Sequence, residues 1–252
     1  MTEPVTAALL VIGDEILSGR TKDRNIGFTA DFLTERGIDL REVRVVPDVL
    51  DEIVAALNAL RHRYTYVFTT GGIGPTHDDI TADAVGAAFG VPVVEDPRVI
   101  ELLLQRIKAA DLNEARRRMA RIPQGADLVE NSISKAPGFK IGNVIVMAGV
   151  PAIMQAMLAA VAPSLEAGPP TLAKSIAIGD IPEGAYAVDL GHVAAQNPDL
   201  SIGSYPSIVD GRFSNEVVVR GKDPAQIAAA VAAIEQIIAD LRATGRDKYT
   251  IT

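Results

Sequence analysis

Short apolar runs alternate with amphipathic stretches from residue 5 to about residue 165. The strand-length runs are residues 5–12, 41–46 and 64–70, and the helical stretches between and after them are residues 25–36, 48–60 and 80–89. Strands and helices in alternation are typical of βα units on a mostly parallel sheet. The pattern therefore predicts an α/β domain.

The remainder of this domain contains shorter elements. Residues 98–120 are predicted to form two helices broken near Asp111, as a peripheral excursion from the core. Strands are then expected at residues 126–130, 139–141 and 143–147, followed by a helix over residues 151–161 with Pro151 in its first turn. The predicted domain closes with that helix.

A Pro- and Gly-rich segment, Glu-Ala-Gly-Pro-Pro-Thr at residues 166–171, separates this region from the rest. Such a composition stops both helix and strand, so we predict one domain over residues 1–168 and a second over residues 172–252. The second domain has the order strand, helix, strand, strand, helix, at residues 172–179, 182–196, 200–206, 215–220 and 224–241. That order predicts a small α+β domain of KH-like or ferredoxin-like type.

Composition narrows the classes of function. With 48% hydrophobic residues the chain has ample material for a core, and its longest apolar runs, such as residues 7–12 and 144–148, are expected to be far too short for a membrane span. The N-terminal residues lack the features of a secretory signal, so a cytoplasmic protein without a membrane is expected. The absence of cysteine excludes disulfides and thiolate sites, and a net charge of -8 disfavours a general nucleic-acid binder.

A Gly-rich loop at residues 71–76, Gly-Gly-Ile-Gly-Pro-Thr, follows a predicted strand and precedes a predicted helix. Doubly wound sheets bind ligands at such positions, and glycines there let backbone N–H groups approach a phosphate. We therefore predict that Gly71, Gly72, Gly74, Pro75 and Thr76 bind a phosphate-bearing ligand. The loop fits neither a Walker P-loop nor a dinucleotide fingerprint, and a tight turn without a ligand is the alternative.

Two carboxylates, Asp78 and Asp79, directly follow this loop. Beside a phosphate they would repel it unless a divalent cation lay between them, so a metal such as Mg²⁺ is predicted. The alternative is that at least one of the two caps the next helix. Asp48 ends another strand and could share the metal at the same sheet edge, although its spacing alone fits a helix cap better.

Further polar residues follow other strands. Gly13 and Asp14 end the first strand, where a simple turn is the alternative. Ser132, Lys135 and Gly138 lie in a polar turn that could bind an anion, with a plain surface loop as the alternative. The three histidines are scattered, and their spacing does not suggest a zinc site.

Four segments together carry a family resemblance. They are Gly-Asp-Glu-Ile-Leu-Ser-Gly at residues 13–19, Pro47-Asp48, Thr-Gly-Gly-Ile-Gly-Pro-Thr-His-Asp-Asp-Ile-Thr at residues 70–81, and Ala136-Pro137-Gly138. They resemble the molybdopterin-binding (MoaB/MogA-like) family, and most of all the N-terminal region of CinA-type competence/damage-inducible proteins. The resemblance implies a three-layer α/β fold whose ligand lies across the Gly-rich loop and the strand ends, with Pro137 beside it.

The resemblance also implies a function. In related adenylyltransferases the acids matching Asp48 and Asp79 act in metal-assisted chemistry on a phosphate. CinA-type domains are linked to divalent-metal-dependent hydrolysis of ADP-ribose-type pyrophosphates, and a similar domain accompanies FAD synthases. The expectation is a pyrophosphatase using Mg²⁺ or Co²⁺, with Asp48, Asp78 and Asp79 at the metal and Asp48 and Asp79 catalytic. Its partner would be a small nucleotide or pterin, and a homo-oligomer is expected.

Two alternatives remain open. One is a molybdopterin- or nucleotide-binding protein without catalysis, which is favoured because residues 148–154, Ala-Gly-Val-Pro-Ala-Ile-Met, lack a proline and an acid usual in the family. Residues 21–25 also depart from the usual pattern. The other is RNA binding by the second domain, which the acidic balance and the lack of a Gly-x-x-Gly loop there oppose. No region matching the CinA deamidase is present in these residues, so deamidase activity is not expected.

Overall fold

The computed structural model describes residues 4–209 and 212–244. It divides into two compact units, residues 1–168 and 169–252. Residues 1–3 and 245–252, which the predicted domain ranges include, lie outside the described residues.

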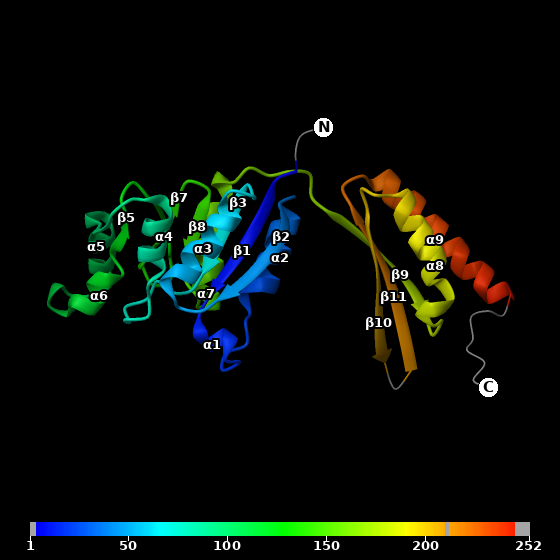
Figure 1. Ribbon diagram of the computed structural model, residues 1–252, viewed down its shortest axis with the longest axis horizontal. Helices are drawn as coiled ribbons and strands as arrows, with labels where there is room; N and C mark the ends of the chain where they lie inside the picture. The colour runs from blue at the N-terminus through cyan, green and yellow to red at the C-terminus, as the bar shows by residue number, and fades with distance from the viewer. Residues whose placement is uncertain (1–3, 210–211, 245–252) are drawn as a thin grey trace. The chain divides into compact units, whose positions relative to one another are not determined.

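A six-stranded, mostly parallel sheet forms the centre of the first unit (Figure 1). Its strands are β1 (Thr6–Ile12), β2 (Asp39–Val46), β3 (Tyr66–Thr70), β6 (Asp127–Val129), β7 (Gly138–Ile141) and β8 (Val144–Met147). The spatial order is β2-β1-β3-β8-β7-β6. Strands β2, β1, β3 and β8 are parallel neighbours, whereas β7 is antiparallel to both β8 and β6.

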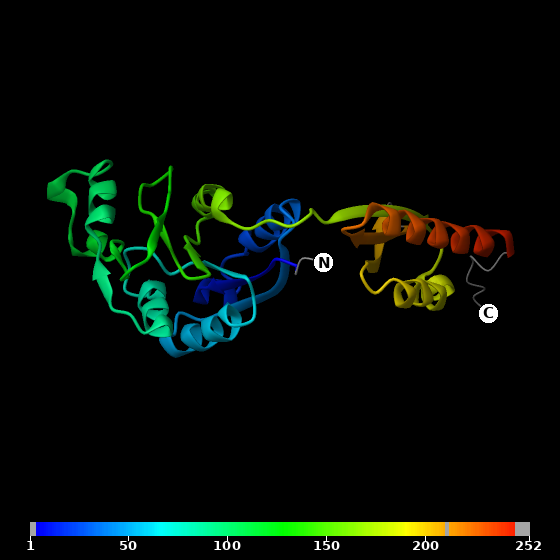
Figure 2. The ribbon, with the colours of Figure 1, turned by 90° about the horizontal axis from the view of Figure 1, so that it is seen from above.

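Helices cover both faces of this sheet, which confirms the predicted three-layer α/β fold (Figure 2). They are α1 (Asp14–Leu17), α2 (Asn25–Glu35), α3 (Leu50–Arg61), α4 (Thr81–Phe89) and α7 (Pro151–Val161), with the 3-10 turn η2 (Ala162–Ser164) after α7. Because β1 and β3 are packed on both sides, their residues are mostly apolar, and all of them except Thr6 are buried.

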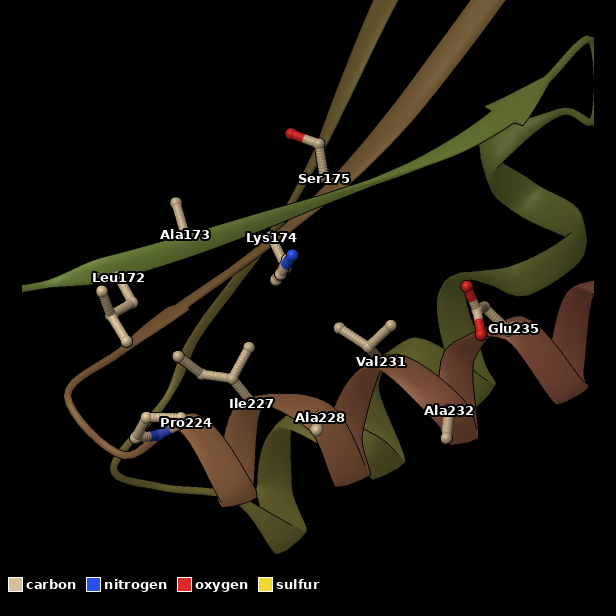
Figure 3. Close-up of a pocket in the computed structure, with 10 residues that line it drawn as sticks. All are labelled: Leu172, Ala173, Lys174, Ser175, Pro224, Ile227, Ala228, Val231, Ala232 and Glu235. Atoms are coloured by element: carbon tan, nitrogen blue, oxygen red, sulfur yellow. The ribbon is translucent and has the colours of Figure 1, made fainter.

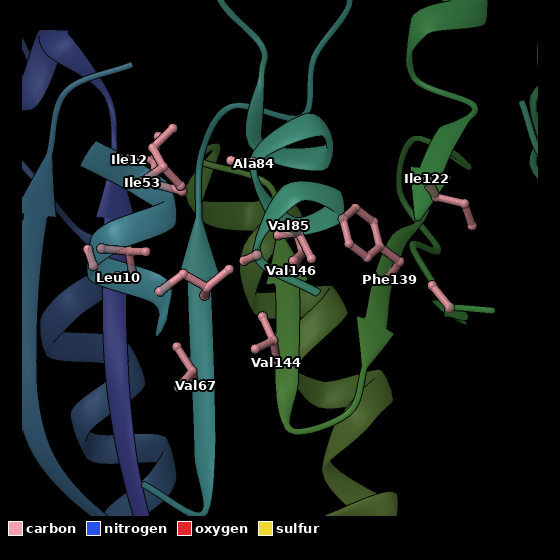
Figure 4. Close-up of a cluster of buried hydrophobic side chains, with 14 of the residues drawn as sticks. Leu10, Ile12, Ile53, Val67, Ala84, Val85, Ile122, Phe139, Val144 and Val146 are labelled. Atoms are coloured by element: carbon pink, nitrogen blue, oxygen red, sulfur yellow. The ribbon is translucent and has the colours of Figure 1, made fainter. Parts of the chain in front are cut away.

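Two hydrophobic clusters fill the spaces between the layers. Figure 4 shows the cluster in which Leu10 and Val67 of the sheet meet Ile53 and Val85 from α3 and α4. The opposite cluster joins Leu9, Leu33 and Met157, among other residues of the sheet, α2 and α7. Residues that alternate along β1 therefore serve two different cores, which fixes the register of the strand.

The segment between α4 and β6 is an excursion with its own small sheet. It contains α5 (Pro97–Leu104), η1 (Ala109–Asp111), α6 (Glu114–Arg118) and an antiparallel pair, β4 (Val93–Glu95) with β5 (Arg121–Pro123). Two helices broken near Asp111 were predicted, but the strand pair was not. The excursion is not peripheral to the core, because Val99, Leu103 and Ile122 are buried in the same cluster as Leu10.

The second unit has the predicted order of elements: β9 (Leu172–Gly179), α8 (Glu183–Gln196), β10 (Ser201–Val209), β11 (Arg212–Gly221) and α9 (Pro224–Thr244). The three strands form an antiparallel sheet in the order β10-β11-β9. Both helices bury side chains against it, as Tyr186, Ile234 and Val217 share one core. The hairpin strands are longer than predicted.

Helix α9 is long and apolar enough to pass a length-and-composition test for a membrane span. Its stripe of Ile227, Ala230, Ile234 and Ile238 is nevertheless buried in the core of the second unit. The adjoining face of α9 and strand β9 form a groove of about 520 Å³, lined by apolar side chains such as Leu172 and Val231 (Figure 3).

Candidate functional site

The site lies where four parallel strands of the first unit end. Asp48 follows β2, Gly13 and Asp14 follow β1, Gly71 follows β3, and Gly149 follows β8. Because these strands are neighbours and run the same way, their following loops meet at one edge of the sheet. The chain also reverses its winding between β1 and β3, and ligands of open α/β sheets bind at such a point.

Gly71 is required by the close approach of three loops. It has φ of +104°, and a Cβ atom there would lie 2.1 Å from the Ile12 carbonyl oxygen. On its other side a Cβ on Gly149 would lie 3.3 Å from the Gly71 Cα. The Gly71 amide donates to the Met147 carbonyl oxygen at 3.2 Å, so Gly71 shapes the site but has no N–H left for a phosphate.

The next three amides are available. In the part of the chain that the structure describes, the N–H groups of Gly72, Ile73 and Gly74 donate no hydrogen bond. Thr81 at the start of α4 holds this part of the loop, because its amide donates to the Gly72 carbonyl at 3.0 Å and its hydroxyl donates to the Gly71 carbonyl at 2.9 Å. With both carbonyls engaged, unpaired N–H groups remain on the loop, as an anion site needs.

Asp79 organises the Gly-rich loop internally. Its Oδ2 accepts hydrogen bonds from the Thr76 amide at 2.7 Å and from the Thr76 hydroxyl at 2.5 Å. A Cβ on Gly74 would lie 2.6 Å from the same oxygen, so a side chain there would require the Asp79 carboxylate to move. The prediction that Asp78 or Asp79 caps α4 is wrong, because Ile80 is the N-cap and no side chain caps that helix.

Asp48 belongs to the site and not to a helix cap. The predicted cap is wrong because α3 begins at Leu50 after Val49, without a side-chain cap. Instead, Asp48 Oδ2 accepts a hydrogen bond from the Asp14 amide at 3.0 Å, which links the ends of β2 and β1. Burial raises the pKa of the Asp48 carboxyl, the Asp14 amide opposes this, and the negative charges of Asp14, Glu15 and Asp78 raise the pKa further.

The carboxylates around Asp48 are also the candidate ligands of the predicted metal. Among residues 4–209 and 212–244, no group of three or more His, Asp or Glu side chains forms a ready-made metal site. The acids around Asp48 suit a different arrangement, in which a hydrated Mg²⁺ is held by one or two carboxylates and completed by substrate phosphates. Burial is the main cause of the raised pKa of Asp48 and the neighbouring acids add to it, so a cation beside this carboxylate would favour its ionised form.

The predicted anion turn after β6 is only partly at the site. Asn131 organises it, since its Oδ1 accepts from the Ile133 and Ser134 amides and its Nδ2 donates to Ala136. Pro137 lines a small cavity together with Gly72 and Gly74. Gly138 is required by packing, because a Cβ there would lie 2.2 Å from the Val146 carbonyl oxygen.

Two of the predicted residues in this turn are not brought to that cavity. Ser132 is exposed and makes no hydrogen bond with any residue the structure describes, and neither Ser132 nor Lys135 lines the cavity. Lys135 has φ of +64° in the turn. Their place in the ligand site stays a prediction.

Two arginines of the excursion reach the site, and sequence reasoning missed them. Arg118 and Arg121 line the same small cavity as Gly72, Gly74 and Asp79. Arg118 Nη2 donates to the Asp79 carbonyl oxygen at 3.2 Å, and Arg121 is paired with Asp83, with Nη2 to Oδ1 at 2.6 Å. The run of arginines at residues 116–118 was visible, but nothing in the spacing indicates contact with a loop about forty positions earlier.

Comparison with known proteins supports the two-part organisation. The family described as a probable molybdopterin binding domain matches residues 8–167, and the family described as the middle domain of FAD synthase matches residues 171–244. A protein from Archaeoglobus fulgidus is 31% identical over 236 residues, which is 93% of this chain and 98% of that protein.

Other relatives are longer than this chain. A CinA-like protein from Sulfurihydrogenibium is 35% identical over 60% of this chain and 40% of its own length. A probable FAD synthase from Caenorhabditis elegans is 28% identical over 95% of this chain and 51% of its own length. Among solved structures, a CinA protein from Thermoplasma acidophilum superposes with a TM-score of 0.61 at 34% identity, over 64% of this chain and 99% of that one.

Proposed function

Because the chain belongs to the family of probable molybdopterin-binding domains, we propose that its first unit is a divalent-metal-dependent pyrophosphatase for a nucleotide diphosphate of the ADP-ribose or FAD type. The observation that carries this proposal is the position of Asp48. A partly buried carboxylate with a raised pKa lies at the end of β2, at the same sheet edge as the unpaired amides that follow β3.

In this proposal different residues of the site bind the phosphates, support the loop, hold the cation and accept the proton. The amides of Gly72 and Gly74 bind phosphoryl oxygens, and Asp79 keeps the loop in shape through Thr76. Asp48 and Asp78 are the carboxylates that would hold a divalent cation, which would supply positive charge against the diphosphate. Asp48 accepts a proton from the attacking water, whose oxygen bonds to phosphorus as the bridging P–O bond breaks. In the protein without a cation, burial raises the pKa of Asp48, which favours proton acceptance; a cation on the same carboxylate would oppose that shift.

A second candidate function is binding of a molybdopterin or nucleotide without turnover. Ile153 stands where the family resemblance leads us to expect an acid, and Oδ2 of Asp79 is already engaged by the amide and hydroxyl of Thr76. Both observations favour a carrier over an enzyme.

Release of mononucleotide from ADP-ribose and from FAD distinguishes the two. The full chain is assayed with Mg²⁺ or Co²⁺ against EDTA, beside Asp48→Asn, Asp79→Ala and the exposed control Asp31→Asn on α2. We expect metal-dependent release that Asp48→Asn lowers by about 100-fold or more, that Asp79→Ala also abolishes, and that Asp31→Asn leaves intact. Tight nucleotide or pterin binding without release would reject the enzyme and leave the carrier.

A further inference from the structure

Arg118 is a cation at the Gly-rich loop whose hydrogen-bonding capacity is not used up. It ends α6 and is only partly exposed. Its Nη2 donates to the Asp79 carbonyl oxygen, but its buried Nε has no partner among the described residues. A buried N–H donor without an acceptor costs free energy. A ligand oxygen could provide the acceptor that the Arg118 Nε–H group lacks.

The neighbouring arginines already form hydrogen bonds or ion pairs with other residues of the excursion and of α4. Arg121, which lines the same cavity, is paired through two nitrogens with Asp83. Arg117 is paired with Glu95 at 2.7 Å and Arg116 donates to the Asp111 carbonyl oxygen at 2.6 Å. Arg118 pairs with no carboxylate within the described chain, so its charge is not bound in an ion pair, although the Asp79 side chain lines the same cavity.

The cavity has a definite size. About 20 Å³ lies between the Gly72 to Gly74 backbone, Arg118 and Pro137. This volume accommodates one water-sized group, and a phosphoryl oxygen is such a group. It does not accommodate a whole phosphate, so the rest of a ligand would lie outside it, over the loop.

We infer that Arg118 binds one phosphoryl oxygen of the diphosphate, together with the unpaired amides of Gly72 and Gly74. This inference rests on the proposed function, because it identifies the part of the chain that holds the anionic end of that ligand. The guanidinium gives a charge-assisted hydrogen bond that a lysine at this position cannot reproduce in geometry. Arg118 also donates to the Asp79 carbonyl oxygen, so one side chain would contact both the Gly-rich loop region and the phosphoryl oxygen.

The probe is inorganic pyrophosphate, titrated into the full chain with and without Mg²⁺ and followed by calorimetry and by the amide NMR signals of the loop. The variants are Arg118→Ala and Arg118→Lys, with Arg117→Ala as the matched control, because Arg117 forms an exposed ion pair in the same helix. Thermal unfolding of each variant verifies that it folds.

We expect pyrophosphate to shift the signals of Gly72 and Gly74, and Arg118→Ala to weaken its binding by about 10-fold or more. Arg118→Lys should recover only part of the affinity, and Arg117→Ala should match the wild type. Equal affinity in Arg118→Ala and Arg117→Ala would overturn the inference, as would a wild type that does not bind pyrophosphate. Arg118-dependent binding without hydrolysis of ADP-ribose or FAD would instead reject the proposed function and leave this inference standing.

Discussion

The two units both pack helices on a sheet, yet they place polar groups very differently. In the first unit four parallel strands end at one edge, so Asp48, the Gly-rich loop and Gly149 converge there. In the second unit the strands are antiparallel, so their ends alternate between edges. The larger hollow, about 520 Å³, is the second unit's groove, which is lined mainly by apolar residues; the site cavity is about 20 Å³. Strand direction, more than volume, indicates where ligand chemistry collects.

The largest expected effect comes from the loop that makes this convergence possible. Gly71→Ala places a methyl group 2.1 Å from the Ile12 carbonyl oxygen at a φ of +104°. Because backbone lies on the other side of the clash, we expect a loss of roughly 4 kcal/mol or more in the free energy of unfolding of the first unit. Urea denaturation followed by circular dichroism measures it.

A matched control for Gly71 is available. Gly19→Ala also requires a positive φ, +71°, but its Cβ meets nothing within 4 Å, so it should cost only about 1 kcal/mol. If the two substitutions cost the same, the close approach of β1 and β3 is not what requires a glycine at residue 71.

A core truncation in the second unit tests whether only the first unit binds the ligand. Ile178 belongs to β9 and is fully buried in the core of the second unit, and Ile178→Ala should lower the free energy of unfolding by about 3 kcal/mol. Hydrogen exchange of the β9 to β11 amides reports the loss, and pyrophosphate titration reports the site. We expect faster exchange in the second unit with unchanged pyrophosphate binding. Weaker binding would show that the second unit takes part in the site.

The smallest effect is a pH-dependent gain in stability from Asp48→Asn. The folded pKa of Asp48 is raised by burial and by the neighbouring acids. The folded state therefore holds the proton more tightly than the unfolded state. The protonated Asp48 carboxyl makes its full contribution to the free energy of unfolding at pH values below its pKa in the unfolded state. That contribution is lost as the pH rises through its pKa in the folded state. At neutral pH the ionised Asp48 thus destabilises the fold, and the amide should recover up to about 1 kcal/mol.

Urea denaturation from pH 3.5 to 7.5 without a divalent cation tests this, with Asp31→Asn as the exposed control. The gain should shrink toward zero at the acid end. A gain in stability that is independent of pH, or a loss of stability at neutral pH, would contradict the conclusion that folding raises the pKa of Asp48. Together with lost turnover, the gain would mark a residue kept for function at the expense of stability.

Local patterns predicted most of the fold. The runs that became β1 and β3 are apolar except for Thr6, Thr69 and Thr70, because helices cover both faces of the sheet, and the Gly–Pro segment at residues 166–171 stops any regular element. Both features can be recognised from the local sequence. The β4–β5 pair could not be predicted, since each strand has three residues and its partner lies across the whole excursion. The helix caps predicted for Asp48 and for one of Asp78 and Asp79 are wrong, and two of these carboxylates accept hydrogen bonds elsewhere: Asp48 from the Asp14 amide and Asp79 from Thr76.

The sequence by itself determined that a glycine-rich turn and acids follow parallel strands, because hydrophobic period and turn chemistry are local properties. Only the tertiary structure decided which backbone amides and side chains at this edge of the sheet remain free to bind a ligand. It engaged the Gly71 amide with Met147, left those of Gly72 and Gly74 unpaired, and brought Arg118 to the carbonyl of Asp79. Those outcomes depend on contacts between segments far apart along the chain, and the order of residues does not encode such contacts in any local pattern.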